Sequence, residues 1–356
     1  MGHTVTSVTP FPQDDDDHIC VPGQAINRGG VQREQGVVKK KTWLGVIKAG
    51  ARMLLYWPDP DIRWARGVVK AIGQADIKAD ILLTTSPPES IHVAGAKLSQ
   101  VLGLPWVAEM RDTWILNSHR KILNQSKIRV LGERYIAKST LSKVNGIMAV
   151  SDVLMDEARE FVKVDTPELV LSHFTVPPEN NYVQQVLPAD EINLVHTGSF
   201  SLSDHRRTIG PLLEILQQCP VLDYPVRFHV VGELTSEEKQ LVEASPVRVT
   251  LHGLKSLEEA RGFQLAADAL ILYTPEDSHS LPGKYAEYAA TGRPIYVVGN
   301  GSWTNLVDVP IPKLKDSMAL LCTNPVKKNH AYITADEAAD TVSGFLQRVL
   351  TRNDEV

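Results

Sequence analysis

Cysteine is scarce in this chain. Only Cys20, Cys219 and Cys322 occur among 356 residues, and no two of them stand in a CxxC spacing. A disulfide framework and a cysteine-ligated zinc site are therefore not expected, and this cysteine usage is typical of a reducing cytoplasm. A basic excess is also missing, because 37 lysines and arginines stand against 42 aspartates and glutamates. General nucleic-acid binding is not expected, since the chain lacks the surplus cations that neutralise phosphates.

Long apolar runs are absent as well. No run approaches the roughly 18 residues that a membrane-spanning helix needs, and the N-terminus does not read as a signal peptide. The hydrophobic fraction of 43% and charged fraction of 22% are those of a globular protein. We expect a cytoplasmic protein of two ordinary domains, with no metal site, because no cluster of metal ligands is visible.

One stretch organises the rest of the sequence. Residues 280–294, SLPGKYAEYAATGRP, lie between the apolar runs 269–273 and 295–298. A Pro-Gly pair is suited to opening a helix in this stretch, and Gly292 with Pro294 is suited to closing it. A strand, a loop, a helix and a second strand form a βαβ unit.

The first turn of the expected helix carries charge. Lys284 lies in that turn, and Glu287 lies on the same face of the helix. The cation and the free amides beginning at Gly283 could hold a diphosphate, while the carboxylate binds a pair of sugar hydroxyls. An exposed Lys284–Glu287 ion pair, worth roughly a few tenths of a kcal/mol, is the competing interpretation.

This stretch resembles the PGKLFEYLAAGRPIL segment of bacterial family 4 glycosyltransferases of the GT-B fold. The resemblance implies an α/β protein with two Rossmann-like domains facing across a cleft. It implies that Gly283 and Lys284 bind the donor diphosphate and that Glu287 binds the ribose. The implied substrates are a nucleoside-diphosphate sugar and a glycan, lipid-linked or small-molecule acceptor, with no cofactor. Retention of anomeric configuration and a role in cell-surface polysaccharide or glycoconjugate synthesis follow from the same resemblance.

Many relatives of that family carry an earlier glutamate, with seven residues between it and the second. Counting back from Glu287 places His279 there. His279 and Ser280 are therefore weak candidates for contacts with the donor sugar, whose identity stays open. A loop histidine without a role is the alternative.

A glycine loop follows the expected strand 192–196. Gly198 permits close approach of the backbone to phosphate, and Arg206 and Arg207 come before the next helix. By resemblance to the family's glycine loop, we expect the Gly198 N–H and one of these arginines to bind the diphosphate. Solvated surface arginines are the competing interpretation.

In the first half, the strand 105–110 runs into Arg111 and Asp112. Ligands of open α/β sheets bind at the carboxyl ends of the strands. Resemblance to the family's RD-x-W segment implies that Arg111 and Asp112 line the acceptor side near the reacting sugar. A salt bridge that fixes the loop is the alternative. Ser90 and Ser151 are each expected to cap the helix that follows them.

The expected domains are 1–187, on the acceptor side, and 188–356, which binds the nucleotide sugar. A terminal helix at 338–351 is expected to pack back across both. The segment 37–56 is basic and apolar at helical spacing, so it predicts either peripheral contact with the inner face of a membrane or a helix packed on the sheet.

Residues 2–12 resemble the family's second strand, so the first strand, glycine loop and helix are expected to be missing. Two alternatives to an active transferase remain. One is a truncated, non-catalytic homologue that binds a partner. The other is a sugar-nucleotide epimerase on the same fold, in which Asp112 and His279 transfer protons.

Overall fold

The computed structural model describes residues 3–11, 17–21, 57–115, 127–177, 182–202, 207–218, 225–274, 282–299, 313–314 and 332–354. The segment 37–56, Arg206, His279 and Ser280 lie outside these residues. The chain forms two compact units, Met1–Leu171 with Asp340–Val356, and Ser172–Ala339. The sequence predicted a change of domain after Leu187. The compact units change over at Leu171 because β7 (Phe174–Thr175) pairs with β13 (Ile333–Thr334) within the second unit.

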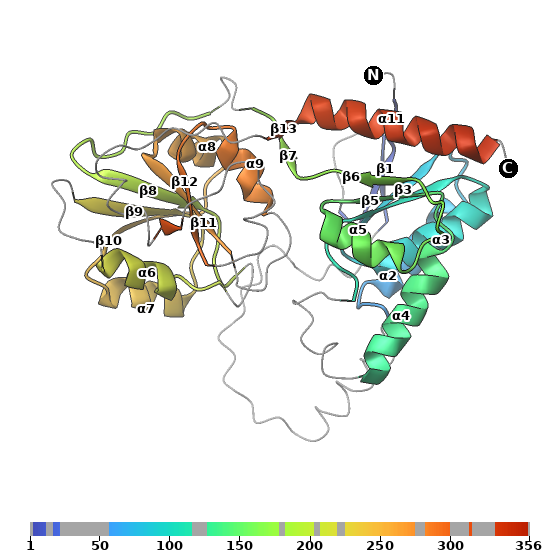
Figure 1. Ribbon diagram of the computed structural model, residues 1–356, viewed down its shortest axis with the longest axis horizontal. Coiled ribbons are helices and arrows are strands. Elements are labelled where there is room, and N and C mark those ends of the chain that lie inside the picture. Colours follow the sequence, from blue (N-terminus) through green and yellow to red (C-terminus); the bar gives the residue numbers. More distant parts are fainter. Residues whose placement is uncertain are drawn as a thin grey trace. The chain divides into compact units, whose positions relative to one another are not determined.

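The first unit is built on a parallel sheet of order β3-β4-β5-β6. Figure 1 labels β3, β5 and β6 of this sheet. Its strands and the helices connected to them are β3 (Leu82–Ser86), β4 (Trp106–Met110), β5 (Gly146–Ala149), β6 (Glu168–Val170), α2 (Ile62–Ile72), α3 (Ser90–Leu102), α4 (Lys127–Leu141) and α5 (Asp152–Arg159). The two central strands are almost wholly buried, which explains why their residues are apolar or glycine apart from the half-buried Glu109 of β4. A separate parallel pair joins β1 (Ser7–Thr9) to β2 (His18–Cys20).

The terminal helix α11 (Ala335–Asp354) runs longer than the predicted 338–351. Phe345 and Val349 of this helix pack in one cluster with Val107 and Met148 of the first unit's sheet. A Cβ at Gly146 would lie 2.8 Å from Val349, so a glycine at that strand position permits the close approach of the helix.

The second unit is built on a parallel sheet of order β10-β9-β8-β11-β12. Its elements are β8 (Ile192–Thr197), α6 (Gly210–Gln217), β9 (Val226–Val231), α7 (Ser236–Ala244), β10 (Arg248–Gly253), α8 (Leu257–Ala266), β11 (Ala269–Tyr273), α9 (Gly283–Ala289) and β12 (Ile295–Val298). Successive strand residues enter opposite cores: Leu194 packs in one cluster and Val195 in the other. This strand order is the Rossmann order 3-2-1-4-5. The predicted α/β class, with parallel sheets, is confirmed.

Of the two helix caps predicted from the local sequence, one is confirmed and the other is wrong. The Ser151 hydroxyl accepts a bond from the Leu154 N–H, which confirms the predicted cap of α5. The predicted Ser90 cap is wrong, because Ser90 lies inside α3 and the preceding Glu89 makes no side-chain cap. The Ser90 N–H instead donates to the buried Asp59 carboxylate at 2.7 Å. A carboxylate 31 positions earlier thus satisfies one of the free N–H groups at the start of α3, where the local pattern predicted a serine cap.

Candidate functional site

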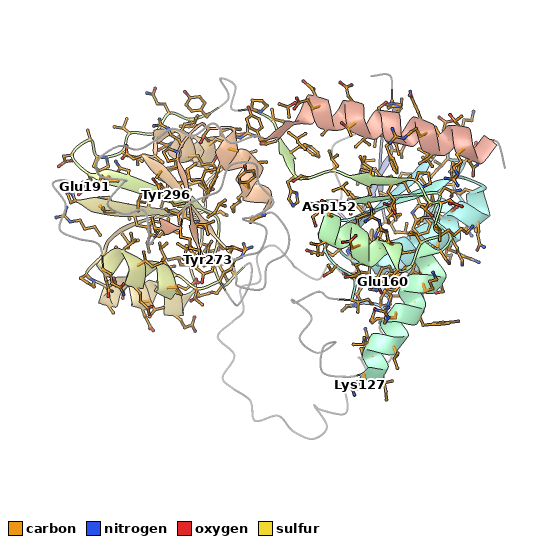
Figure 2. The ribbon with its side chains drawn as sticks, in the orientation of Figure 1. Lys127, Asp152, Glu160, Glu191, Tyr273 and Tyr296 are labelled. Atoms are coloured by element: carbon orange, nitrogen blue, oxygen red, sulfur yellow. The ribbon has the colours of Figure 1, made fainter. Side chains whose placement is uncertain are left out.

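The second sheet offers one topological switch point. Chain connections leave β8 toward β9 on one side, whereas β11 lies on its other side. In open α/β sheets, ligands bind where the strand order reverses, beyond the carboxyl ends of the strands. Figure 2 labels Glu191, which precedes β8, and Tyr273, which ends β11, so the two residues mark the amino and carboxyl ends of this sheet. Gly198 follows β8 directly at the carboxyl end.

Gly198 and Lys284 come together at this point. A Cβ built on Gly198 would lie 2.7 Å from Cε and 2.8 Å from Nζ of Lys284. Gly198 also has φ +115°, a backbone conformation that residues with a side chain rarely adopt. The glycine therefore gives the lysine side chain its path across the end of β8.

The expected donor role of the Gly198 N–H needs correction. This amide donates to the carbonyl oxygen of Val231 at 2.7 Å, so it is already engaged between β8 and β9. Gly232 (φ +156°) is just as closely packed, because a Cβ there would lie 2.3 Å from the Gly198 carbonyl oxygen. What Gly198 supplies is space for Lys284.

Lys284 is half-buried in the first turn of α9. Burial lowers the pKa of its ammonium, Glu287 opposes that shift, and Arg207 adds to it. No Lys284–Glu287 ion pair occurs among the described residues, so the competing exposed pair is not formed. A partly desolvated cation that forms no ion pair with a carboxylate of the described residues is suited to receive an anion.

The start of α9 contributes less to anion binding than the sequence indicated. α9 spans seven residues, too short for a large macrodipole. Gly283 is exposed, and a Cβ there would lie 3.9 Å from the ring of His173. The His173 ring therefore lies beside the first residue of α9.

Glu287 is half-buried one turn after Lys284. The Gln264 amide lies between two groups, donating to the Thr197 hydroxyl at 3.0 Å and to the Glu287 carboxylate at 3.5 Å. The Thr197 N–H donates to the hydroxyl of Tyr288, whose pKa burial raises to about 12. These bonds tie the end of β8 to α8 and α9 and hold Glu287 near the glycine loop.

Arg207 is half-buried in the loop before α6. Its charge lowers the pKa of both Lys284 and His196, which means that it lies close to both. Arg207, one of the two arginines proposed from the sequence, therefore acts electrostatically on this group, whereas Arg206 lies outside the described residues.

His196 belongs to the site, although the sequence interpretation missed it. The ring is buried, donates from Nδ1 to the Ile271 carbonyl at 2.8 Å, and stacks on Phe200 at 4.5 Å. Burial lowers the pKa of His196 to about 4, and Lys284 and Arg207 add to that effect. The imidazole is therefore neutral at pH 7, and it adds no third positive charge to those of Lys284 and Arg207. Its place just before the glycine loop is the only signal that the sequence offers.

The first unit holds the remaining candidates. Arg111 is exposed directly after β4 and donates its N–H to the Ser86 carbonyl at 3.2 Å, while Asp112 is half-buried. Buried carboxylates anchor the segment that follows. Glu133 accepts from the indole of Trp114 at 3.0 Å, and Glu157 accepts from the backbone of Ile115 at 2.7 Å. Arg111 and Asp112 thus stand at the carboxyl end of a buried parallel strand.

The chain resembles known proteins in structure and not in sequence. No protein-family model matches the chain, and no curated protein matches it. Among solved structures, the chain is similar to the apo form of the lipopolysaccharide outer core galactosyltransferase WaaB, with 9% identity over 81% of both chains and a TM-score of 0.49. It is similar to AviGT4, a glycosyltransferase involved in avilamycin A biosynthesis, with 13% identity, a TM-score of 0.47, and coverage of 81% of this chain and 78% of that one. TarM is similar at 12% identity and a TM-score of 0.48, over 80% of this chain and 55% of TarM. Such low scores assign neither a family nor an activity to this chain.

No helix in the described ranges is long and apolar enough to span a membrane. No group of three or more histidine, cysteine, aspartate or glutamate side chains there could hold a metal ion.

Proposed function

We propose that this chain is a GT-B glycosyltransferase that moves a sugar from a nucleoside-diphosphate sugar to a glycan, lipid-linked or small-molecule acceptor. In this proposal the second unit binds the donor, and Arg111 and Asp112 of the first unit serve the acceptor side. Retention of configuration and a role in cell-surface polysaccharide or glycoconjugate synthesis are part of the proposal. They rest on the resemblance of the segment 280–294 to family 4 enzymes.

One observation carries the proposal: Lys284 lies against Gly198 at the switch point of a Rossmann-ordered sheet. Burying an ammonium without a partner costs free energy, and its lowered pKa reflects that cost. A bound diphosphate offsets the cost, because a charge-assisted hydrogen bond contributes about 1.5–3 kcal/mol. Arg207 adds a second cation beside the first.

Glu287 complements these cations as the ribose ligand. An ionised carboxylate only accepts hydrogen bonds, and two neighbouring hydroxyls of a ribose can donate to its two oxygens. Gln264, bonded to both Thr197 and Glu287, fixes the carboxylate relative to the glycine loop. The spacing of one helical turn between Lys284 and Glu287 matches a ligand with a phosphate at one end and a sugar at the other.

The chemistry follows from where charge develops. Transfer breaks the bond between the anomeric carbon and the diphosphate oxygen, so negative charge grows on the leaving diphosphate. Fixed cations stabilise that charge in the transition state more than in the bound donor. Lys284 and Arg207 supply this stabilisation without a metal ion. His196, neutral at pH 7, adds no charge to this pair of cations.

The test measures unfolding of the purified chain with UDP, GDP, ADP, CDP or dTDP. A nucleotide at 100 times its dissociation constant should raise the free energy of unfolding by about 2.7 kcal/mol. We expect Lys284→Ala and Glu287→Ala each to abolish the shift. Lys255→Ala is the matched control, because Lys255 also lies near a helix start and contacts Glu259 at 3.4 Å. It should keep the full shift.

Folded protein that no nucleotide stabilises would overturn the proposal and favour the non-catalytic homologue. If a nucleotide binds, product analysis with the corresponding sugar nucleotides separates the remaining possibilities. Conversion of the donor to a new sugar nucleotide without an acceptor would identify an epimerase. Transfer only when an acceptor is present supports the glycosyltransferase.

A further inference from the structure

A cavity of about 480 Å³ opens in the first unit, and neither Arg111 nor Asp112 lines it. Residues of α2, α3 and α4 line it together with Trp57 and Pro58. Its apolar lining includes Trp57, Ile62, Ala65, Val93, Ala94 and Ile136. A volume in this range is typical of pockets for small molecules.

The rim of this cavity has one sign of charge. Arg66 of α2, Lys97 of α3 and Lys143 just after α4 line it, all three exposed, and none of the described lining residues is acidic. Among the ion pairs found in the described ranges, none involves these three cations. Residues of α2 and α3 and the residue segment after α4 therefore place three cations, none of them ion-paired within the described ranges, around an apolar hollow, in a chain whose formal net charge is −5.

One wall of the cavity is held rigidly. A Cβ on Gly132 of α4 would lie 1.9 Å from the Trp57 ring, so the indole packs directly on the helix backbone. The Arg129 guanidinium lies 4.5 Å from the centre of the same ring and donates to the Pro58 carbonyl at 2.7 Å. Arg129 also pairs with the buried Glu133 at 2.7 Å. A preformed wall lowers the ordering cost of binding.

The chain's own segment 37–56 does not match this cavity in charge. It directly precedes Trp57 in sequence, but it carries Lys39, Lys40, Lys41, Lys48 and Arg52 and no acidic residue. The complementary occupant has an apolar body and a negative head.

We propose that this cavity binds a single-chain anionic amphiphile, with its hydrocarbon chain among the apolar residues and a phosphate or carboxylate head on Arg66, Lys97 and Lys143. The apolar lining gives affinity in proportion to the buried chain, and the cations select the sign of the head group. This site shares no residue with the proposed nucleotide site, because every lining residue belongs to the first unit.

The test is titration calorimetry of the full chain with decyl phosphate below its micellar concentration. Inorganic phosphate and decyltrimethylammonium serve as probes that lack the chain or invert the head charge. We expect decyl phosphate to bind at least tenfold more tightly than either. The triple variant Arg66→Gln, Lys97→Gln, Lys143→Gln should weaken decyl phosphate at least tenfold. The matched control Lys70→Gln, Lys78→Gln, Lys163→Gln makes the same charge change at exposed positions of this unit that do not line the cavity, and should bind as wild type.

A second variant, Val69→Trp, fills the cavity from α2 without changing charge, and it should also abolish binding in protein that unfolds cooperatively. Undiminished binding by both the rim and the filled variants, or no binding by wild type, would overturn the proposal. So would loss of binding in Lys284→Ala, which would assign the ligand to the nucleotide site. Binding only to vesicles that contain phosphatidylglycerol, and not to decyl phosphate, would overturn it in favour of a bilayer surface.

Discussion

Replacing Gly198 by alanine tests two roles of this glycine: it leaves space for the Lys284 side chain, and it adopts a positive φ. The new methyl group would lie 2.7–2.8 Å from the end of the Lys284 side chain, which is flexible and would move away. The backbone, at φ +115°, would resist the new Cβ, with a strain of about 1–3 kcal/mol. We therefore expect a folded protein with a lower free energy of unfolding and a displaced ammonium.

The loss of binding follows from that displacement. Removing one charge-assisted hydrogen bond to phosphate costs about 1.5–3 kcal/mol, which is roughly a ten- to hundredfold increase in Kd for the nucleoside diphosphate. Urea unfolding without ligand measures the strain, and calorimetric titration with the nucleotide measures the affinity. The two effects are separate quantities, so each has its own control.

Gly103→Ala controls for backbone strain alone. Gly103 has φ +68° and no atom within 4 Å of a built Cβ, so alanine there should cost about 1 kcal/mol and leave nucleotide affinity unchanged. Gly232→Ala is the opposite extreme, because its Cβ would meet the Gly198 carbonyl at 2.3 Å, and it should impair folding more than Gly198→Ala. If Gly198→Ala loses stability but binds the nucleotide with wild-type affinity, Lys284 does not act at this glycine and the reasoning fails.

Three further predictions concern the first unit. Glu133→Ala removes the carboxylate that pairs with Arg129 at 2.7 Å and should lower the free energy of unfolding by about 3–5 kcal/mol in urea titrations, whereas Glu160→Ala, at an exposed pair, should change it by less than about 1 kcal/mol. Burial lowers the pKa of His92 to about 3, so between pH 6.5 and 3 the unfolded chain binds a proton that the folded chain does not. The free energy of unfolding should therefore fall with decreasing pH, by about 3 kcal/mol from His92 alone between pH 7 and 4.5, and His92→Gln should reduce that fall. Gly95→Ala places a Cβ 2.7 Å from the Trp106 indole nitrogen and should lower the melting temperature through overpacking of about 1–3 kcal/mol; an unchanged melting temperature would contradict this packing.

The βαβ unit at 269–298 was determined by the sequence itself. Two apolar runs, a Pro-Gly pair at the helix start and Gly292 at its end are local signals, and the structure has β11, α9 and β12 at those places. Gly292 has φ +65°, which only glycine adopts without strain. The Ser151 cap was predictable for the same reason, because its partner is three residues away.

Contacts between distant residues were decided by the tertiary structure. Gly198 and Lys284 meet because the strand order places β8 beside β11, and no local pattern states that order. The same limit hid the Asp59 contact at the start of α3, the neutral His196, and the basic rim shared by three helices. Sequence periodicity reports which face of an element is buried, whereas the partner that buries it depends on the packing of the whole unit.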